Sequence, residues 1–155
     1  PAIPATWLTS DGALDTGRLL DAFLAFWRQY GEPLLRSAPY SEVAAQLVMM
    51  AFLQRVRNGG GTIDREYAVG RGRLDLCLRY GRVTLAIEMK VWRDDQRNPL
   101  REGLAQIDLY LAGLGLDTGW LVIFDQRSGL EPIEVRTTTE RQPTPGGRTV
   151  TVIHA

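Results

Sequence analysis

The chain has 155 residues, enough for one compact domain with a sizeable buried core. Hydrophobic residues make up 45% of it and charged residues 23%, which is ordinary for a soluble globular protein, and no apolar run approaches the length that spans a membrane. Eighteen basic and eighteen acidic residues leave no net charge, so a nucleic-acid binder of this sequence would need a local basic patch.

An irregular lead-in with two prolines and an Asp-Gly turn signal is expected over residues 1–12. It starts with proline and no methionine, which suits either methionine removal or a domain of a longer protein. Apolar side chains then recur at helical spacing from Asp15 to about Tyr30, and Gly31 and Pro33 are expected to stop that helix. We interpret it as a packing helix.

A second helix is predicted from Ser41, a suitable N-cap, to about Arg57, where an asparagine and three glycines follow. Its body is apolar nearly all round, so the helix should be buried. Glu42 and Gln46 are the polar exceptions, one turn apart. Glu42 either complements the helix dipole in the first turn or directs a carboxylate into a site.

Three strands are expected next. The segment 62–69 resembles a strand, and 72–92 contains two more, in which apolar and polar residues alternate with period two. A two-residue turn at Tyr80-Gly81 would join these two into a hairpin. Lys90 lies on the second arm and is the only lysine of the chain, since every other basic position is arginine.

A helix is predicted over 99–114, with proline at its start and a polar stripe that includes Gln106 and Tyr110. The continuous apolar run 120–124 is typical of a central strand that is covered on both faces. The step from the second arm of the hairpin through this helix to this strand implies a parallel pair with a right-handed crossover.

The predicted fold is a single α/β domain with three layers, α/β/α, and a mixed central sheet. The sheet is mixed because an antiparallel hairpin precedes the parallel pair, and helices should cover both faces. A terminal hairpin over 133–140 and 148–154 would follow. The domain divides into a helical lead-in at 1–39, a core at 40–125 and a C-terminal hairpin at 126–155.

The predicted hairpin brings charged side chains together. With the turn at Tyr80-Gly81, Asp75 lies opposite Ala86, and Glu88 and Lys90 share that face because side chains alternate. A register slip of one residue would move Asp75 to the wrong face. The other face is apolar and is expected to be packed; it carries Leu74, Leu76, Leu78, Leu85, Ile87 and Met89.

Two carboxylates close together in a partly buried sheet repel each other unless a cation lies between them. A hard divalent ion with oxygen ligands would satisfy them, and such an ion can activate a water and neutralise charge that develops on a phosphate. Lys90 could then orient the water or contact the phosphate as a point charge. The alternative is a structural network of salt bridges between Asp75, Glu88 and Lys90 on a solvated face.

Asp75 followed by Glu88-Met89-Lys90 resembles the motif of the PD-(D/E)XK nuclease superfamily, the restriction-endonuclease-like fold. The surrounding elements match too, with Glu42 in a preceding helix, Gly72-Arg73-Leu74-Asp75-Leu76 on the first arm, and Gln106 and Tyr110 in the following helix. The match covers roughly 40–125, and is more narrowly similar to nuclease-like domains at the C-terminus of certain bacterial and archaeal AAA-type ATPases. No proline precedes Asp75, a departure that divergent members share.

The resemblance implies a nuclease that hydrolyses DNA phosphodiesters with Mg²⁺ or Mn²⁺. Asp75 and Glu88 would be metal ligands, and the main-chain carbonyl of Met89 would complete the set. Glu42 would be an auxiliary ligand, direct or through water. Lys90 would position the nucleophile.

Gln106 and Tyr110 would, by the same resemblance, support the site or contact the DNA backbone, and an ATPase domain could lie upstream. Two alternatives stay open. One is a non-catalytic module that binds nucleic acid or a partner on the same fold, and the other is a purely structural mixed-sheet domain.

A single cysteine excludes an internal disulfide and fits a reducing cytoplasm. Cys77 shares the face of Asp75 in the predicted register and is expected to be a small packing residue, because no histidine is placed to activate it. His154 is the only histidine, which excludes a multi-histidine metal site within this chain, and it is expected at the surface.

Overall fold

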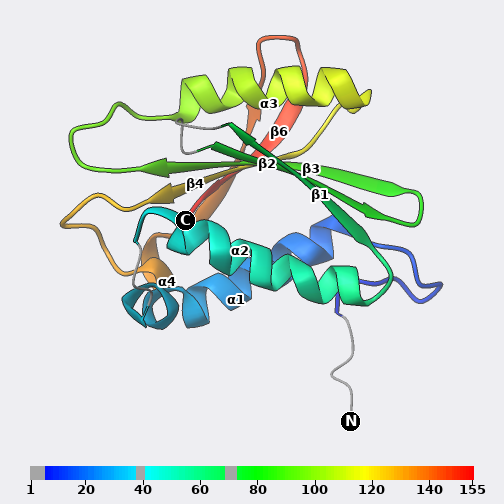
Figure 1. Cartoon of the computed structure of the whole chain (residues 1–155), viewed down its shortest axis with the longest axis horizontal. Helices are drawn as coiled ribbons and strands as arrows, with labels where there is room; N and C mark the ends of the chain where they lie inside the picture. Colours follow the sequence, from blue (N-terminus) through cyan, green and yellow to red (C-terminus); the bar gives the residue numbers. More distant parts are fainter. Residues whose placement is uncertain (1–5, 38–40, 69–72) are drawn as a thin grey trace.

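The computed structural model describes residues 6–37, 41–68 and 73–155; at 36–37, 41–43, 66–68 and 73–75 it describes the backbone alone. A mixed sheet lies between α3 on one face and α1, α2 and α4 on the other, as predicted (Figure 1). The elements in chain order are α1 (Thr16–Ser37), α2 (Ser41–Asn58), β1 (Thr62–Ala68), β2 (Arg73–Tyr80), β3 (Val83–Trp92), α3 (Leu100–Leu114), β4 (Trp120–Asp125), α4 (Ile133–Arg136), β5 (Thr138–Pro143) and β6 (Thr149–His154).

The six strands of the sheet have the order β1-β2-β3-β4-β6-β5. The first three form an antiparallel meander, and β3, β4 and β6 run parallel to one another. The predicted parallel pair is therefore β3 and β4, which α3 connects across one face. The terminal hairpin adds β6 beside β4, with β5 antiparallel at the edge. The prediction placed that hairpin outside the core at 40–125, whereas its second strand, β6, completes the parallel centre of the sheet.

The register of the β2–β3 hairpin differs by two residues from the prediction. Tyr80 pairs with Val83, so the turn is Gly81-Arg82 rather than Tyr80-Gly81. Gly81 takes the first turn position with a φ of 58°, a conformation that suits glycine. Because the shift is even, every side chain keeps its predicted face, but Asp75 now pairs with Glu88 instead of Ala86.

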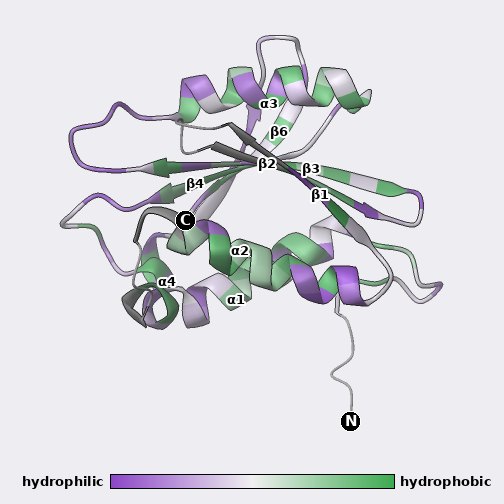
Figure 2. Cartoon of the chain, viewed as in Figure 1, coloured by the Kyte–Doolittle hydropathy of each residue, from purple (hydrophilic) through white to green (hydrophobic). Residues whose placement is uncertain are grey.

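The two faces of the sheet build two cores. Toward α1 and α2 the sheet presents an apolar face, which packs against buried aromatic side chains of these helices. The contributing strand residues include Leu76, Leu78, Leu85, Ile87, Met89, Val122, Phe124 and Ile153. Figure 2 shows α2 hydrophobic over most of its length, but only one side of the helix is buried. Met49, Phe52 and Leu53 lie in the core whereas Leu47 is 61% exposed, so the predicted burial holds for one face only. Each large apolar side chain that is fully buried stabilises the fold by ~1.5–3 kcal/mol.

The core under α3 is smaller. Ile107 and Leu111 of the helix pack on Leu121, Ile123 and the valines of β6. This face of the sheet is the one that also carries Glu88 and Lys90, since Glu88 is the register partner of Leu121 and Lys90 that of Ile123. A buried apolar layer therefore abuts buried charged groups beneath one helix.

The first helix continues past its predicted end. α1 includes Gly31 and Pro33 and ends at Ser37. A Cβ added at Gly31 would lie 3.1 Å from the Trp27 ring and 3.2 Å from Ile133 Cδ1, so the glycine allows α1 and α4 to approach closely. Proline inside a helix removes one hydrogen bond and costs ~3 kcal/mol or more. Packing against α4 outweighs that local preference.

The segment predicted as a strand over 133–140 is divided between α4 and the start of β5. Pro132 precedes the short helix with a φ of −55°, and the Ile133 amide donates to Glu32 Oε1 of α1 at 2.9 Å. This long-range cap turns the chain before the strand begins. In the parts of the chain that the structure describes, every helix is too short or too polar to cross a membrane.

Candidate active site under α3

The amino group of Lys90 is buried beneath the first two turns of α3. Its residue is 6% exposed, and Nζ donates a hydrogen bond to Gln106 Oε1 at 3.1 Å. The ammonium of a lysine has three donors and no acceptor, so a buried one requires such partners. Gln106, which the resemblance implies would support the site or contact the DNA backbone, thus contacts Lys90 directly, between α3 and β3.

Glu102 completes this group, although the sequence analysis did not single it out. Gln106 Nε2 donates to Glu102 Oε1 at 2.9 Å, and the same oxygen lies 3.6 Å from Lys90 Nζ. Glu102 precedes Gln106 by four residues and therefore lies on the same face of the helix. We call Lys90, Glu102 and Gln106 the lysine triad. In the sequence, Glu102 is marked only by its spacing of four residues from Gln106. Solvent-exposed helix surfaces show the same spacing.

Glu88 is fully buried on the same face of the sheet as Lys90. Its partner across the β2–β3 ladder is Asp75, of which only the backbone is described. Directly opposed residues of an antiparallel pair have Cβ atoms ~4.5–5.5 Å apart and share a face. The two predicted metal ligands are therefore direct neighbours, closer than the predicted register placed them.

The third residue of the α3 stripe, Tyr110, reaches the sheet two residues further along β2, at the next position on the same face. Its hydroxyl group is hydrogen-bonded to the Cys77 side chain, and Cys77 is the register partner of Ala86. Burial raises the pKa of the Cys77 thiol, so this cysteine is a neutral packing residue, as predicted. Tyr110 supports the layer beside the lysine triad.

Of the two remaining predicted ligands, Glu42 lies elsewhere, and Met89 was predicted to contribute only its main-chain carbonyl. Glu42 is in the first turn of α2, on the opposite face of the sheet from α3, and its side chain is outside the described residues. The Met89 side chain is fully buried among the apolar residues that face α1 and α2. Only the main chain of Met89, not its side chain, could take part in the site.

The donor atoms of the predicted ligand set fit a hard divalent ion. The set consists of two opposed carboxylates and a main-chain carbonyl, and Mg²⁺ and Mn²⁺ prefer such oxygen ligands. Among the described side chains no group of three or more His, Cys, Asp and Glu lies together as a metal site would require. The side chains of Asp75 and Glu42 are outside the described residues, so the predicted ligand set extends beyond them.

Comparison of the chain with protein-family models, curated proteins and solved structures found no match.

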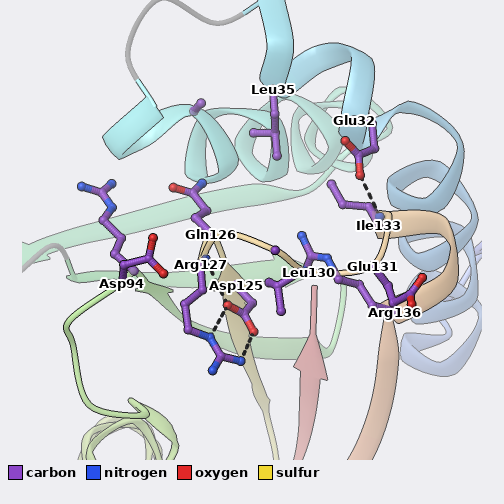
Figure 3. Close-up of a pocket in the computed structure, with 13 residues that line it drawn as sticks. Glu32, Leu35, Asp94, Asp125, Gln126, Arg127, Leu130, Glu131, Ile133 and Arg136 are labelled. Carbon is purple, nitrogen blue, oxygen red and sulfur yellow. Dashed lines mark hydrogen bonds and ion pairs between the residues drawn. The ribbon is translucent and has the colours of Figure 1, made fainter.

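A separate cavity of about 610 Å³ opens where β3 and β4 end and α1, α2 and α4 meet (Figure 3). Its charged groups bind one another: Arg127 donates to both carboxylate oxygens of Asp125, at 2.9 and 2.7 Å. The Arg127 guanidinium also lies 3.4 Å from the centre of the Trp92 ring. None of the residues predicted for the site lines this cavity, and its lining contains both basic and acidic side chains.

A second polar cluster was also missed. Asp108 of α3 accepts hydrogen bonds from Thr144 Oγ1 at 2.6 Å, from the Gly146 amide at 3.0 Å and from Arg148 Nη1 at 3.0 Å. These bonds tie the β5–β6 turn to the helix. A Cβ at Gly146 would lie 2.7 Å from Asp108 Oδ2, so a larger residue there would displace the Asp108 carboxylate. The partners are 36 or more residues away in sequence, and no local pattern indicated them.

Proposed function

We propose that this chain is a divalent-metal-dependent nuclease that hydrolyses DNA phosphodiesters, with the restriction-endonuclease-like arrangement that its motif resembles. The observation that carries the proposal is the position of Lys90. Its ammonium lies on the same face as Glu88 and is held by Gln106, a residue that the resemblance had assigned to the site. A merely solvated salt-bridge network would not require a buried lysine bonded to a neutral amide.

In this proposal Asp75 and Glu88 hold the ion, with the Met89 carbonyl as a further ligand. Glu42, on α2 at the other face of the sheet, is left out of the set. When bound, Mg²⁺ or Mn²⁺ supplies an activated water and neutralises charge on the phosphate. The Lys90 ammonium is a compact point charge. It can stabilise the negative charge that develops on the phosphate oxygens, or orient the attacking water.

Gln106 restricts where that charge lies. The amide oxygen accepts one of the three donors of Lys90 and leaves the other two directed elsewhere. Because both side chains are largely buried, the ammonium is weakly screened by water and interacts more strongly with a phosphate than a surface lysine would. The site is thus suited to electrostatic stabilisation rather than to nucleophilic catalysis by a side chain.

The test is a cleavage assay with double-stranded, single-stranded and branched DNA, in Mg²⁺, in Mn²⁺ and in excess chelator. Asp75→Asn, Glu88→Gln and Lys90→Met should each abolish most cutting. These variants must be purified in parallel with the wild type, so that a contaminating nuclease would appear in all of them. Equal cutting by wild type and variants, or none by the wild type, would overturn the proposal.

A non-catalytic module on the same fold is the second candidate. The complete burial of Glu88 favours it, because a metal ligand needs a path to solvent. It predicts DNA or partner binding that does not depend on Mn²⁺ and does not change in Glu88→Gln. The ATPase domain that the resemblance implies upstream stays a prediction under either candidate.

A further inference from the structure

Glu102 has a carboxylate in contact with the Lys90 ammonium, and it differs from its two partners in exposure. Its side chain is 61% exposed, whereas that of Lys90 is 8% exposed. Glu102 belongs to the first turn of α3, where the chain enters the helix. Within the lysine triad, the exposed Glu102 side chain therefore links the solvent-facing side of α3 to the buried Lys90 side chain of β3.

We propose that Glu102 is a positioning residue, which orients the Gln106 amide and thereby holds the Lys90 ammonium in place. Its importance for catalysis rests on the proposed nuclease function, but the positioning itself does not.

The chemistry of the two groups gives Glu102 this role. An ionised carboxylate only accepts hydrogen bonds, whereas an amide has a donor end and an acceptor end. Glu102 Oε1 therefore takes the Nε2 end of Gln106, at 2.9 Å, and the amide oxygen is turned toward Lys90 Nζ. Without Glu102, Gln106 could rotate toward solvent, and the buried ammonium would lose its acceptor.

The direct contact between Glu102 and Lys90 is weaker than either hydrogen bond. At 3.6 Å it is beyond hydrogen-bonding distance, and a carboxylate so exposed is well screened. Glu102 consequently fixes the lysine through Gln106 more than through its own charge. A phosphate that approaches the ammonium can replace this long contact without breaking the bond to Gln106.

The single lysine of the chain makes the positioning directly measurable. Labelling with ¹⁵N-lysine gives one side-chain Nζ correlation, and its proton exchange with water is slow only while the ammonium is held by acceptors. We expect a visible, slowly exchanging signal in the wild type. Glu102→Ala should speed the exchange at least several-fold, as Gln106→Leu should.

Conservative variants separate orientation from charge. Glu102→Gln retains an oxygen that accepts from Gln106 and should keep most of the protection, whereas Glu102→Asp is one methylene shorter and should lose it. Glu134→Ala removes an exposed acid from the first turn of α4 and serves as the matched control. A wild-type signal and exchange rate in Glu102→Ala would overturn the proposal.

Kinetics supply the second readout. Removing a group that supports a site residue typically costs about 10–100-fold in activity. Glu102→Ala should lower kcat by about that factor, leave KM near the wild-type value, and be partly rescued by Glu102→Gln. A changed KM with an unchanged kcat would contradict positioning. If the wild type cuts no DNA, the nuclease function fails, and the Nζ signal alone decides the role of Glu102.

Discussion

Glu88 is paired with Asp75 across the β2–β3 ladder, which places two carboxylate-bearing residues at directly opposed positions of a sheet. Like charges at such positions destabilise a sheet. Since Glu88 is also fully buried, its charge is poorly solvated. A bound divalent ion would reverse both effects, so the stability of the protein should report on ion binding.

We therefore expect Mn²⁺ to raise the midpoint of thermal unfolding of the wild type. An ion that binds only the native state, at 100 times its dissociation constant, stabilises by about 2.7 kcal/mol. Glu88→Gln should be as stable as the wild type without metal, or more so, and should lose the response to Mn²⁺. Glu134→Gln, an exposed acid on α4, should retain it. An undiminished response in Glu88→Gln would show that the ion binds elsewhere.

The close contact between α3 and β4 gives a test of packing. A Cβ at Gly103 would lie 2.8 Å from Leu121 Cδ1, in the core under α3. Alanine favours a helix over glycine by about 1 kcal/mol, but overpacking costs about 1–3 kcal/mol. Gly103→Ala should therefore lower the free energy of unfolding, measured in urea.

Gly113 is the matched control for that measurement. It lies in the same helix, and a Cβ there would meet nothing within 4 Å. Gly113→Ala should raise the free energy of unfolding by up to about 1 kcal/mol. If both substitutions stabilise, the helix has room to move away from β4, and the separation of α3 from the sheet is not fixed by Gly103.

Asp108 makes part of the stability depend on pH. The hydrogen bond from Thr144, together with those from Arg148 and Gly146, holds the pKa of the Asp108 carboxyl below its ordinary value, against the opposing effect of burial. A carboxyl with a lowered pKa in the folded state stabilises the protein above its unfolded pKa, about 3.9. That contribution is lost as the pH falls through the folded pKa.

Asp108→Asn should accordingly be destabilised most near neutral pH, and the difference from the wild type should shrink as the pH falls below about 4. The amide nitrogen of asparagine would replace one carboxylate oxygen. It would then face either the Gly146 amide, which donates to Oδ2, or the donors of Thr144 and Arg148, which share Oδ1, and this explains the loss. Urea unfolding over a range of pH measures it. Asp117→Asn, at an exposed position, is the control. A difference that stays constant with pH would contradict the role of the charge.

DNA contacts are expected next to the lysine triad. Arg97 and Arg101 are exposed, on the loop before α3 and in its first turn. If they contact phosphates, Arg97→Ala and Arg101→Ala should each weaken binding. Each should also reduce the slope of log affinity against log salt concentration by about one, because one counterion fewer is released. Arg141→Ala, on the far edge strand β5, should change neither. Equal salt slopes in all three variants would exclude this surface.

The parts of the fold that depend on local pattern were predictable. The period-two alternation around Asp75 and Glu88 placed both on one face, and that conclusion survived a two-residue error in the turn because the error was even. The apolar run of β4 and the amphipathic α3 likewise indicated a strand–helix–strand unit. Gln106 was assigned to the site by the resemblance alone, and the structure shows it on the side of α3 that faces the sheet.

The errors share a cause in long-range contacts. α1 passes through Pro33 because α4, about 100 residues later, packs on it and receives a cap from Glu32. Glu102 contacts Lys90 because α3 lies over the sheet at a position that brings Glu102 Oε1 within 3.6 Å of Lys90 Nζ, and the sequence does not specify that position. Periodicity assigns a side chain to a face, but it does not report which distant atom that face meets.

The strand order also has a consequence for synthesis on the ribosome. β6 is made after the other five strands of the sheet, yet it lies between β4 and β5. Until it emerges, one edge of β4 has no partner, and Leu121 and Ile123 lack the two valines that cover them. A nascent chain without these residues would present an unpaired apolar strand edge, the kind of surface that chaperones bind and that associates with other chains.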